Sequence, residues 1–215
     1  MKKQKADYCL YLCTDRHTNG KLDFLQTIEQ ALQGGCSVVQ LREKECGTRE
    51  FYQRAADVKA LTDQYNIPLI INDRIDVCMA VNADGVHLGQ EDMPVKEARK
   101  ILGDEKIIGV SAHNLEEALK AWKEGADYLG VGAIFGTKTK KNTVDTSVET
   151  LREICSQVPI PVVAIGGISI ENVVQLRHTG IDGVAVVSAI MAAEEPKRAA
   201  AELLIKVREV RNEGI

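Results

Sequence analysis

The stretch Gly125-Ala-Asp-Tyr-Leu-Gly-Val131 decides the fold, because it closes one element and opens the next. The glycine stops the helical pattern before it, and the apolar run after it is typical of a strand buried on both faces. Similar stretches recur as Asn82-Ala-Asp-Gly-Val86 and Gly180-Ile-Asp-Gly-Val184. A helix-to-strand junction that recurs along one chain indicates alternating helices and parallel strands.

Outward from these junctions, short apolar runs alternate with amphipathic segments. The segments between the runs are expected as helices, including 170–178, and one long helix from Ala189 or later to about Arg211 closes the chain. The apolar runs predict eight strands, at 8–14, 37–41, 69–71, 85–88, 107–110, 128–131, 161–165 and 183–187.

Eight strand–helix units favour an α/β fold, a closed (β/α)8 TIM barrel. We expect a single domain over residues 1–215, of which 1–7 form a polar N-terminal extension. An open doubly wound sheet is the alternative. It would need a glycine-rich turn after the first strand, where Thr14-Asp-Arg-His-Thr18 stands instead.

The composition argues against several classes of partner. The net charge of −4 argues against nucleic acid, and no apolar run is long enough to span a membrane. The polar start lacks the apolar core of a signal peptide, so a cytoplasmic location is expected. The six cysteines lack the paired spacing of a zinc site and are expected as small buried residues in a reducing compartment. The oligomeric state stays open, with a homodimer as one option.

Polar side chains gather after the ends of the predicted strands. In (β/α)8 barrels the active site lies at those C-terminal ends, so the side chains are expected around one mouth. In chain order the set contains Gln40, Arg42, Lys44, Asn72, Asp73, His87, Asp92, Ser111, Thr137, Thr139, Lys140, Gly166, Gly167 and Ser188.

The stretch Val131–Thr143 is typical of a phosphate-binding loop. Thr137 and Thr139 offer hydroxyl donors, and Lys140 adds charge without fixed geometry. A solvated basic loop is the simpler interpretation. The glycines and lysines of residues 132–145 make closure over bound substrates plausible.

A second phosphate signal lies at the end of the chain. Gly166-Gly167 follows the seventh predicted strand, and Ser188 opens the helix after the eighth. Barrels bind a monophosphate at this place, on backbone N–H groups and a helix N-terminus. Together with the cations after the second strand, this predicts two phosphorylated ligands, or one ligand with two phosphate ends.

Asp73 and Asp92 follow neighbouring strands and could share a Mg²⁺ ion. Magnesium takes few protein carboxylates and completes its shell with phosphate oxygens and water. Each aspartate also has a simpler interpretation, because Asp73 could cap a helix starting at Arg74 and Asp92 could cap the helix after Pro94. Residues 42–44 could likewise be an exposed charged loop.

Seven ordered motifs resemble the thiamine-phosphate synthase family over Tyr8 to about Ile190. The motifs are Gln40-Leu-Arg-Glu-Lys44, Asn72-Asp73, His87-Leu-Gly-Gln-Glu-Asp92, Gly109-Val-Ser-Ala-His113, Thr137-x-Thr139-Lys140, Gly166-Gly-Ile168 and Val187-Ser188. The resemblance implies a transferase that joins hydroxymethylpyrimidine diphosphate to thiazole phosphate, giving thiamine monophosphate and diphosphate. It also implies a dissociative mechanism, in which diphosphate leaves before the thiazole nitrogen attacks.

The resemblance assigns a role to each matching position. Asp73 and Asp92 would hold Mg²⁺, and Lys140, Ser111, Arg42 and Lys44 would act on the departing diphosphate. The pyrimidine diphosphate would be held by Gln40, Arg42, Lys44, Asn72, Ser111 and Lys140. The thiazole phosphate would be held by Thr137, Thr139, Gly166 or Gly167, Val187 and Ser188.

Two positions depart from the family pattern, since Ala133 stands where proline is common and Asn142 where aspartate is common. Both flank the threonines and concern the stiffness of the loop more than the chemistry. A thiazole tautomerase and a non-catalytic sensor of thiamine precursors are the alternative functions. The complete Thr-x-Thr-Lys motif argues against the first, and the pair Asp73 and Asp92 argues against the second.

Overall fold

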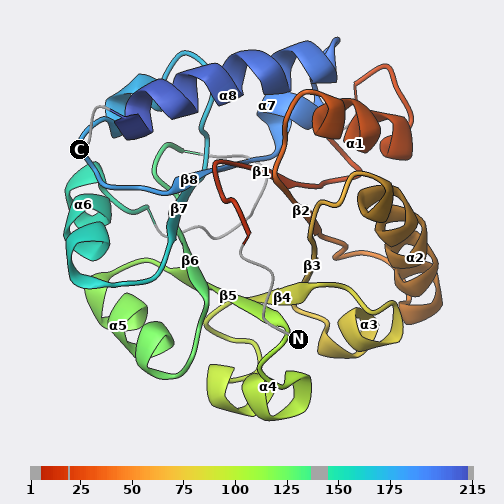
Figure 1. Cartoon of the computed structure of the whole chain (residues 1–215), viewed down its shortest axis with the longest axis horizontal. Coiled ribbons are helices and arrows are strands. Elements are labelled where there is room, and N and C mark those ends of the chain that lie inside the picture. The colour runs from red at the N-terminus through yellow and green to blue at the C-terminus, as the bar shows by residue number, and fades with distance from the viewer. Residues whose placement is uncertain (1–5, 19, 137–144, 213–215) are drawn as a thin grey trace.

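The computed structural model describes residues 6–18, 20–136 and 145–212. Eight parallel strands form a closed barrel in chain order, and the last strand pairs with the first. Helices surround the strands on the outside (Figure 1). The predicted (β/α)8 fold is therefore confirmed. The strands are β1 (Leu10–Cys13), β2 (Val38–Leu41), β3 (Leu69–Asn72), β4 (Gly85–Leu88), β5 (Ile107–Ala112), β6 (Tyr128–Val131), β7 (Val162–Ile165) and β8 (Gly183–Val186).

The α-helices follow the amphipathic segments of the sequence. Within the described residues, none of them has the length and apolar character to cross a membrane. The helices are α1 (Phe24–Gln33), α2 (Thr48–Gln64), α3 (Ile75–Ala80), α4 (Val95–Leu102), α5 (Leu115–Lys123), α6 (Val148–Gln157), α7 (Ser188–Met191) and α8 (Pro196–Asn212).

One predicted helix was wrong in detail. The segment 170–178 contains only the 3-10 helix η1 (Val173–Leu176). The Asn172 side chain accepts from the Ser169 N–H and donates to the Gly167 carbonyl, and such local bonds favour a turn over a helix. The closing helix, expected from Ala189 or later to about Arg211, is confirmed as α8, and Pro196 is suited to start it. The short helix α7 precedes it.

The repeated junctions carry a repeated hydrogen bond. Each aspartate of the three stretches precedes an even-numbered strand and accepts from a backbone N–H at the start of the strand before it. The bonds are Leu69 N to Asp84 Oδ2 at 2.9 Å, Ile108 N to Asp127 Oδ2 at 2.8 Å and Val162 N to Asp182 Oδ2 at 2.9 Å. Before β2, the hydroxyl of Ser37 accepts from Leu10 N at 3.2 Å. The residue before each of the four even-numbered strands thus accepts a hydrogen bond from the strand before it. These bonds lie at the end of the barrel opposite the predicted site.

The barrel has an inner and an outer apolar cluster. The inner cluster contains Val38, Ile70 and Ile107 together with three tyrosines, whereas the larger outer cluster lies between strands and helices. Residues two apart on a strand share a face. Gln40 on β2, Asn72 on β3 and Ser111 on β5 therefore share the inward face of Val38, Ile70 and Ile107 respectively.

Candidate active site

The sequence-predicted site residues that the structure describes lie at or just beyond the C-terminal ends of the strands. Because all eight strands are parallel in one closed barrel, these ends surround a single mouth. Gln40, Asn72 and Ser111 belong to the strands themselves, and Arg42, Asp73, Gly166 and Val187 directly follow β2, β3, β7 and β8. Thr137, Thr139, Lys140 and Asn142 lie outside the described residues.

Asp73 and Asp92 form an acidic pair at this mouth. Burial raises the pKa of Asp92 above its ordinary value, and the neighbouring Asp73 carboxyl raises it further. Lys44 Nζ contacts Asp73 Oδ2, and its charge acts against this rise. The negative charges of these two neighbouring carboxylates repel each other, so the pair suits a bound cation.

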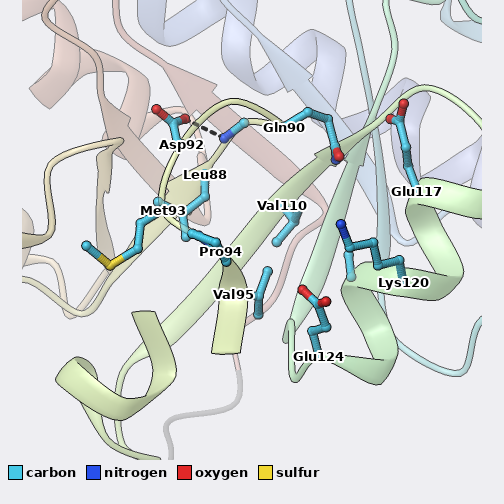
Figure 2. A pocket seen from close by; sticks show the side chains of 12 residues that line it. Leu88, Gln90, Asp92, Met93, Pro94, Val95, Val110, Glu117, Lys120 and Glu124 are labelled. Atoms are coloured by element: carbon cyan, nitrogen blue, oxygen red, sulfur yellow. Dashed lines mark hydrogen bonds between the residues drawn. The ribbon is translucent and has the colours of Figure 1, made fainter. Parts of the chain in front are cut away.

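Neither aspartate caps a helix. The cap positions of α3 and α4 are Arg74 and Pro94, and neither side chain makes a capping hydrogen bond. Asp92 Oδ2 instead accepts from Gly89 N at 2.6 Å, which fixes the loop after β4 (Figure 2). The capping interpretation of both residues was therefore wrong.

Asp73 is held in an uncommon backbone conformation. Its φ of 62° lies in the left-handed region, which costs energy for a residue with a Cβ. Its N–H donates to the His87 carbonyl on β4 at 2.9 Å. The loop after β3 is thereby tied to the neighbouring strand, and the Asp73 carboxylate is directed towards Asp92.

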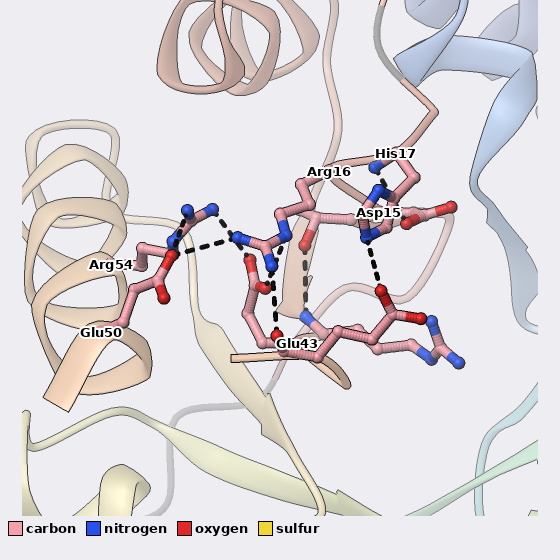
Figure 3. A network of polar contacts seen from close by, with 9 residues as sticks. Asp15, Arg16, His17, Glu43, Glu50 and Arg54 are labelled. Carbon is pink, nitrogen blue, oxygen red and sulfur yellow. Dashed lines mark hydrogen bonds and ion pairs between the residues drawn. The ribbon is translucent and has the colours of Figure 1, made fainter. Parts of the chain in front are cut away.

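The loop after β2 is anchored by an ionic cluster around the buried side chain of Glu43 (Figure 3). The side chain of Glu43 is only 1% exposed, and its two oxygens lie 3.5 Å from Arg16 Nε and 3.3 Å from Arg54 Nη1. Glu50 joins both arginines from the exposed side. The exposed-loop interpretation of residues 42–44 is therefore wrong for Glu43, although Lys44 is half exposed.

Arg42 and Lys44 flank this anchor on either side. The Arg42 N–H donates to the Thr14 hydroxyl at 3.2 Å, which joins the loops that follow β1 and β2. In the motif Arg42-Glu43-Lys44, one buried anion therefore lies between two cations. The contacts of Glu43 hold the loop in its position.

The glycine pair after β7 is required by both conformation and space. Gly166 and Gly167 have φ of 103° and 62°. A Cβ on Gly167 would lie 2.4 Å from the Phe135 carbonyl oxygen, and one on Gly166 would lie 2.6 Å from the Cβ of Ala133. The chain after β6 consequently packs directly on the glycine turn. Ala133 itself is buried there, at the first of the two departures from the family pattern.

Val187 and Ser188 stand at the start of α7, a helix of four residues. A single turn offers backbone N–H groups but little macrodipole. If a phosphate binds here, hydrogen bonds from the backbone will contribute more than the helix field does.

A separate pocket lies on the outer side of β4 and β5. It is lined by residues of both strands, α4 and α5, with Lys120 between Glu117 and Glu124 (Figure 2). Of the proposed substrate and metal residues, only Asp92 lines it. The pocket is therefore distinct from the barrel mouth.

Sequence reasoning missed the residues that hold the predicted ones in place. Arg16 and Arg54 looked like ordinary surface cations, and Tyr11 and Tyr128 looked like ordinary strand formers. One signal was available for the tyrosines: a phenol within a strand buried on both faces needs a hydrogen-bond partner. His87 was expected to be packed or to touch a ligand, and it is 9% exposed inside the barrel.

A closed parallel barrel with cations, carboxylates and a glycine turn at its C-terminal mouth defines the class of (β/α)8-barrel enzymes. Within that class, residues 10–190 match the family model described as thiamine monophosphate synthase. The chain belongs to this family. The predicted family and its transferase activity are thereby confirmed.

Individual relatives match the sequence of this chain over almost their whole length. A thiamine-phosphate synthase of Ruminiclostridium cellulolyticum is 55% identical over 202 residues, which cover 94% of this chain and 96% of the relative. One of Clostridium tetani is 54% identical over 203 residues, covering 94% and 97%. The solved structure of thiamine phosphate pyrophosphorylase from Pyrococcus furiosus superposes with a TM-score of 0.86 at 43% identity, covering 95% of this chain and 98% of that one.

Proposed function

We propose that the barrel mouth joins hydroxymethylpyrimidine diphosphate to thiazole phosphate, giving thiamine monophosphate and diphosphate. The observation that carries the proposal is the adjacency of Lys44, Asp73 and Asp92 at the C-terminal end of the barrel. That adjacency sets cationic and metal-binding groups side by side, as an anionic leaving group requires.

The proposed site for the pyrimidine diphosphate uses residues at or just after the ends of β2, β3 and β5. Arg42 and Lys44 bring positive charge to the diphosphate, Ser111 donates a hydrogen bond, and Gln40 and Asn72 bind the pyrimidine end. When the C–O bond breaks, its electron pair goes to the diphosphate, whose developing charge these donors stabilise. Removing one well-placed donor of this kind typically costs about 3 kcal/mol of transition-state stabilisation. The lone pair of the thiazole nitrogen then forms the new C–N bond.

Asp73 and Asp92 fit a magnesium ion. The described residues contain no group of three or more metal-binding side chains, which would be needed for a cage made of protein alone. Two carboxylates with mutual repulsion suit Mg²⁺, which takes its remaining ligands from phosphate and water. When bound, the ion would supply electrostatic stabilisation of diphosphate oxygens.

The thiazole phosphate is proposed to bind at the opposite side of the mouth. Gly166, Gly167, Val187 and Ser188 would supply backbone N–H groups and a hydroxyl, with Thr137 and Thr139 from the loop. Lys140, from the same loop, is proposed to act on the diphosphate.

A coupling assay tests the function directly. The protein is mixed with both substrates and Mg²⁺, and thiamine monophosphate is expected by mass spectrometry together with one equivalent of diphosphate. Tautomerised thiazole carboxylate as the only product would overturn the proposal in favour of a tautomerase. Binding of both precursors without any product would favour a sensor.

Three further proposals concern the whole protein. We propose that residues 1–215 form a single domain. We also propose that the protein assembles as a homodimer, which sedimentation velocity would test. A cytoplasmic location is supported by the six cysteines, all of which are free thiols, because reducing compartments keep thiols unpaired.

A further inference from the structure

A chain of polar side chains crosses the interior of the barrel from β2 to β5. Gln40 Nε2 donates to Tyr11 Oη at 3.0 Å, and Tyr11 Oη lies 2.7 Å from Tyr128 Oη. Tyr128 Oη lies 2.9 Å from His87 Nδ1, and His87 Nε2 lies 3.0 Å from Ser111 Oγ. The two ends of the chain, Gln40 and Ser111, are residues of the proposed pyrimidine site, whereas the three middle residues have no role there.

The amide of Gln40 sets the direction of every bond in this chain. An amide nitrogen only donates, so Tyr11 Oη accepts from Gln40. The buried Tyr11 proton needs an acceptor of its own, and Tyr128 Oη at 2.7 Å is the one that the described residues offer, so Tyr11 donates to Tyr128. Tyr128 then donates to His87 Nδ1, which makes the imidazole the neutral form with its proton on Nε2. That proton is donated to Ser111 Oγ, and the Ser111 hydroxyl proton is left to point at a ligand.

The barrel is built to admit this chain. A Cβ on Gly109 would lie 2.0 Å from Tyr128 Cζ, and one on Gly130 would lie 3.0 Å from His87 Cε1. Glycines at these two inward positions therefore leave the space that the two rings occupy. A buried polar group without its partner is costly, and a fully paired chain avoids that cost.

Burial also keeps the two tyrosines protonated. It raises the pKa of the Tyr11 and Tyr128 hydroxyls well above the ordinary value. Both phenols therefore keep the protons that the chain needs at neutral pH.

We propose that Tyr11, Tyr128 and His87 are positioning residues, which orient the Ser111 hydroxyl as a hydrogen-bond donor towards the diphosphate of the substrate. This inference rests on the proposed function. A diphosphate offers only acceptors, so a serine held as a donor fits it and a serine held as an acceptor does not. The three residues touch no reacting atom and act through Ser111.

The tautomer of His87 is the most direct test. The protein with ¹⁵N-labelled histidine is observed by NMR without substrate, and His87→Gln identifies the His87 signals among the four histidines. A protonated Nε2 and an unprotonated Nδ1 are expected. An Nδ1-protonated ring would reverse the bonds between Tyr11 and Ser111 and overturn the inference, even if the wild type makes thiamine monophosphate.

Tyr128→Phe tests the effect on catalysis, with Tyr8→Phe as the matched control. The Tyr8 and Tyr128 rings pack with centroids 4.7 Å apart in the same inner cluster, but the Tyr8 hydroxyl stands outside the chain. Tyr128→Phe is expected to lower kcat about tenfold with little change in KM, because Ser111 loses its orientation and keeps its place. Tyr8→Phe is expected to retain kcat.

The outcomes separate the two proposals. An equal loss of kcat in both variants would assign the effect to ring packing and overturn the inference. If Tyr128→Phe fails to fold, the tautomer measured in the wild type still decides. A wild type that makes no thiamine monophosphate would reject the proposed function, whatever the tautomer.

Discussion

Glu43 Oε1 lies 3.3 Å from Arg54 Nη1, and the glutamate side chain is only 1% exposed. Arg54 and Arg16 face this buried side chain and compensate its charge. One buried side chain thereby joins α2, the loop after β1 and the loop that carries Arg42 and Lys44.

Glu43→Gln is expected to lower the free energy of unfolding by about 1–3 kcal/mol, because the half-buried Arg16 and Arg54 lose a buried anion and keep only the half-exposed Glu50. The KM for the pyrimidine diphosphate should rise as Arg42 and Lys44 lose their support. Urea denaturation and steady-state kinetics measure the two effects. Glu50→Gln is the matched control, since Glu50 contacts the same arginines from a half-exposed position and little change is expected. Equal stability of the two variants would contradict the anchoring role.

Gly109→Ala is expected to destabilise the barrel by about 1–3 kcal/mol, because the added Cβ would overlap the Tyr128 ring. Thermal unfolding measures the change. Gly47→Ala provides the comparison, since a Cβ there meets nothing within 4 Å. The packing argument fails if both variants melt at the same temperature.

Asp73→Asn is expected to reduce turnover strongly and to weaken activation by Mg²⁺, without lowering the unfolding temperature. Asparagine tolerates the left-handed conformation of this position and removes the repulsion with Asp92. Titration of activity with Mg²⁺ measures the effect, and Asp76→Asn on the exposed side of α3 is the control. Full activity of the wild type in EDTA would exclude a metal at this pair.

Ser111→Ala is expected to lower kcat about 10²-fold, as for the loss of one oriented donor to a developing anion. Single-turnover kinetics with the pyrimidine diphosphate isolates this step from product release. Ser156→Ala, on α6, serves as the control because its hydroxyl bonds only within its own helix. Unchanged single-turnover rates in Ser111→Ala would remove Ser111 from the chemistry.

Much of the fold was predictable because two periodicities repeat along the chain. The continuous apolar runs located all eight strands, and junctions such as Gly125-Ala-Asp located where helices end. The segment 170–178 was mispredicted because hydrogen bonds of the Asn172 side chain compete with helix formation. The spacing of apolar residues does not reveal such bonds.

The site was predictable to the extent that chemistry requires particular residue types after particular strands. Asp73 and Asp92 could be paired because parallel strand ends meet. The supporting residues could not, since nothing local to Arg16 or Arg54 reveals that both reach the same glutamate. Likewise, the bond between Tyr11 and Tyr128 joins residues 117 positions apart, a separation that no local pattern reports.

The bonds made by Ser37, Asp84, Asp127 and Asp182 have an evolutionary consequence. Because these bonds lie at the end of the barrel away from the ligands, descendants could acquire new substrates by altering loops alone, and their closure would stay intact.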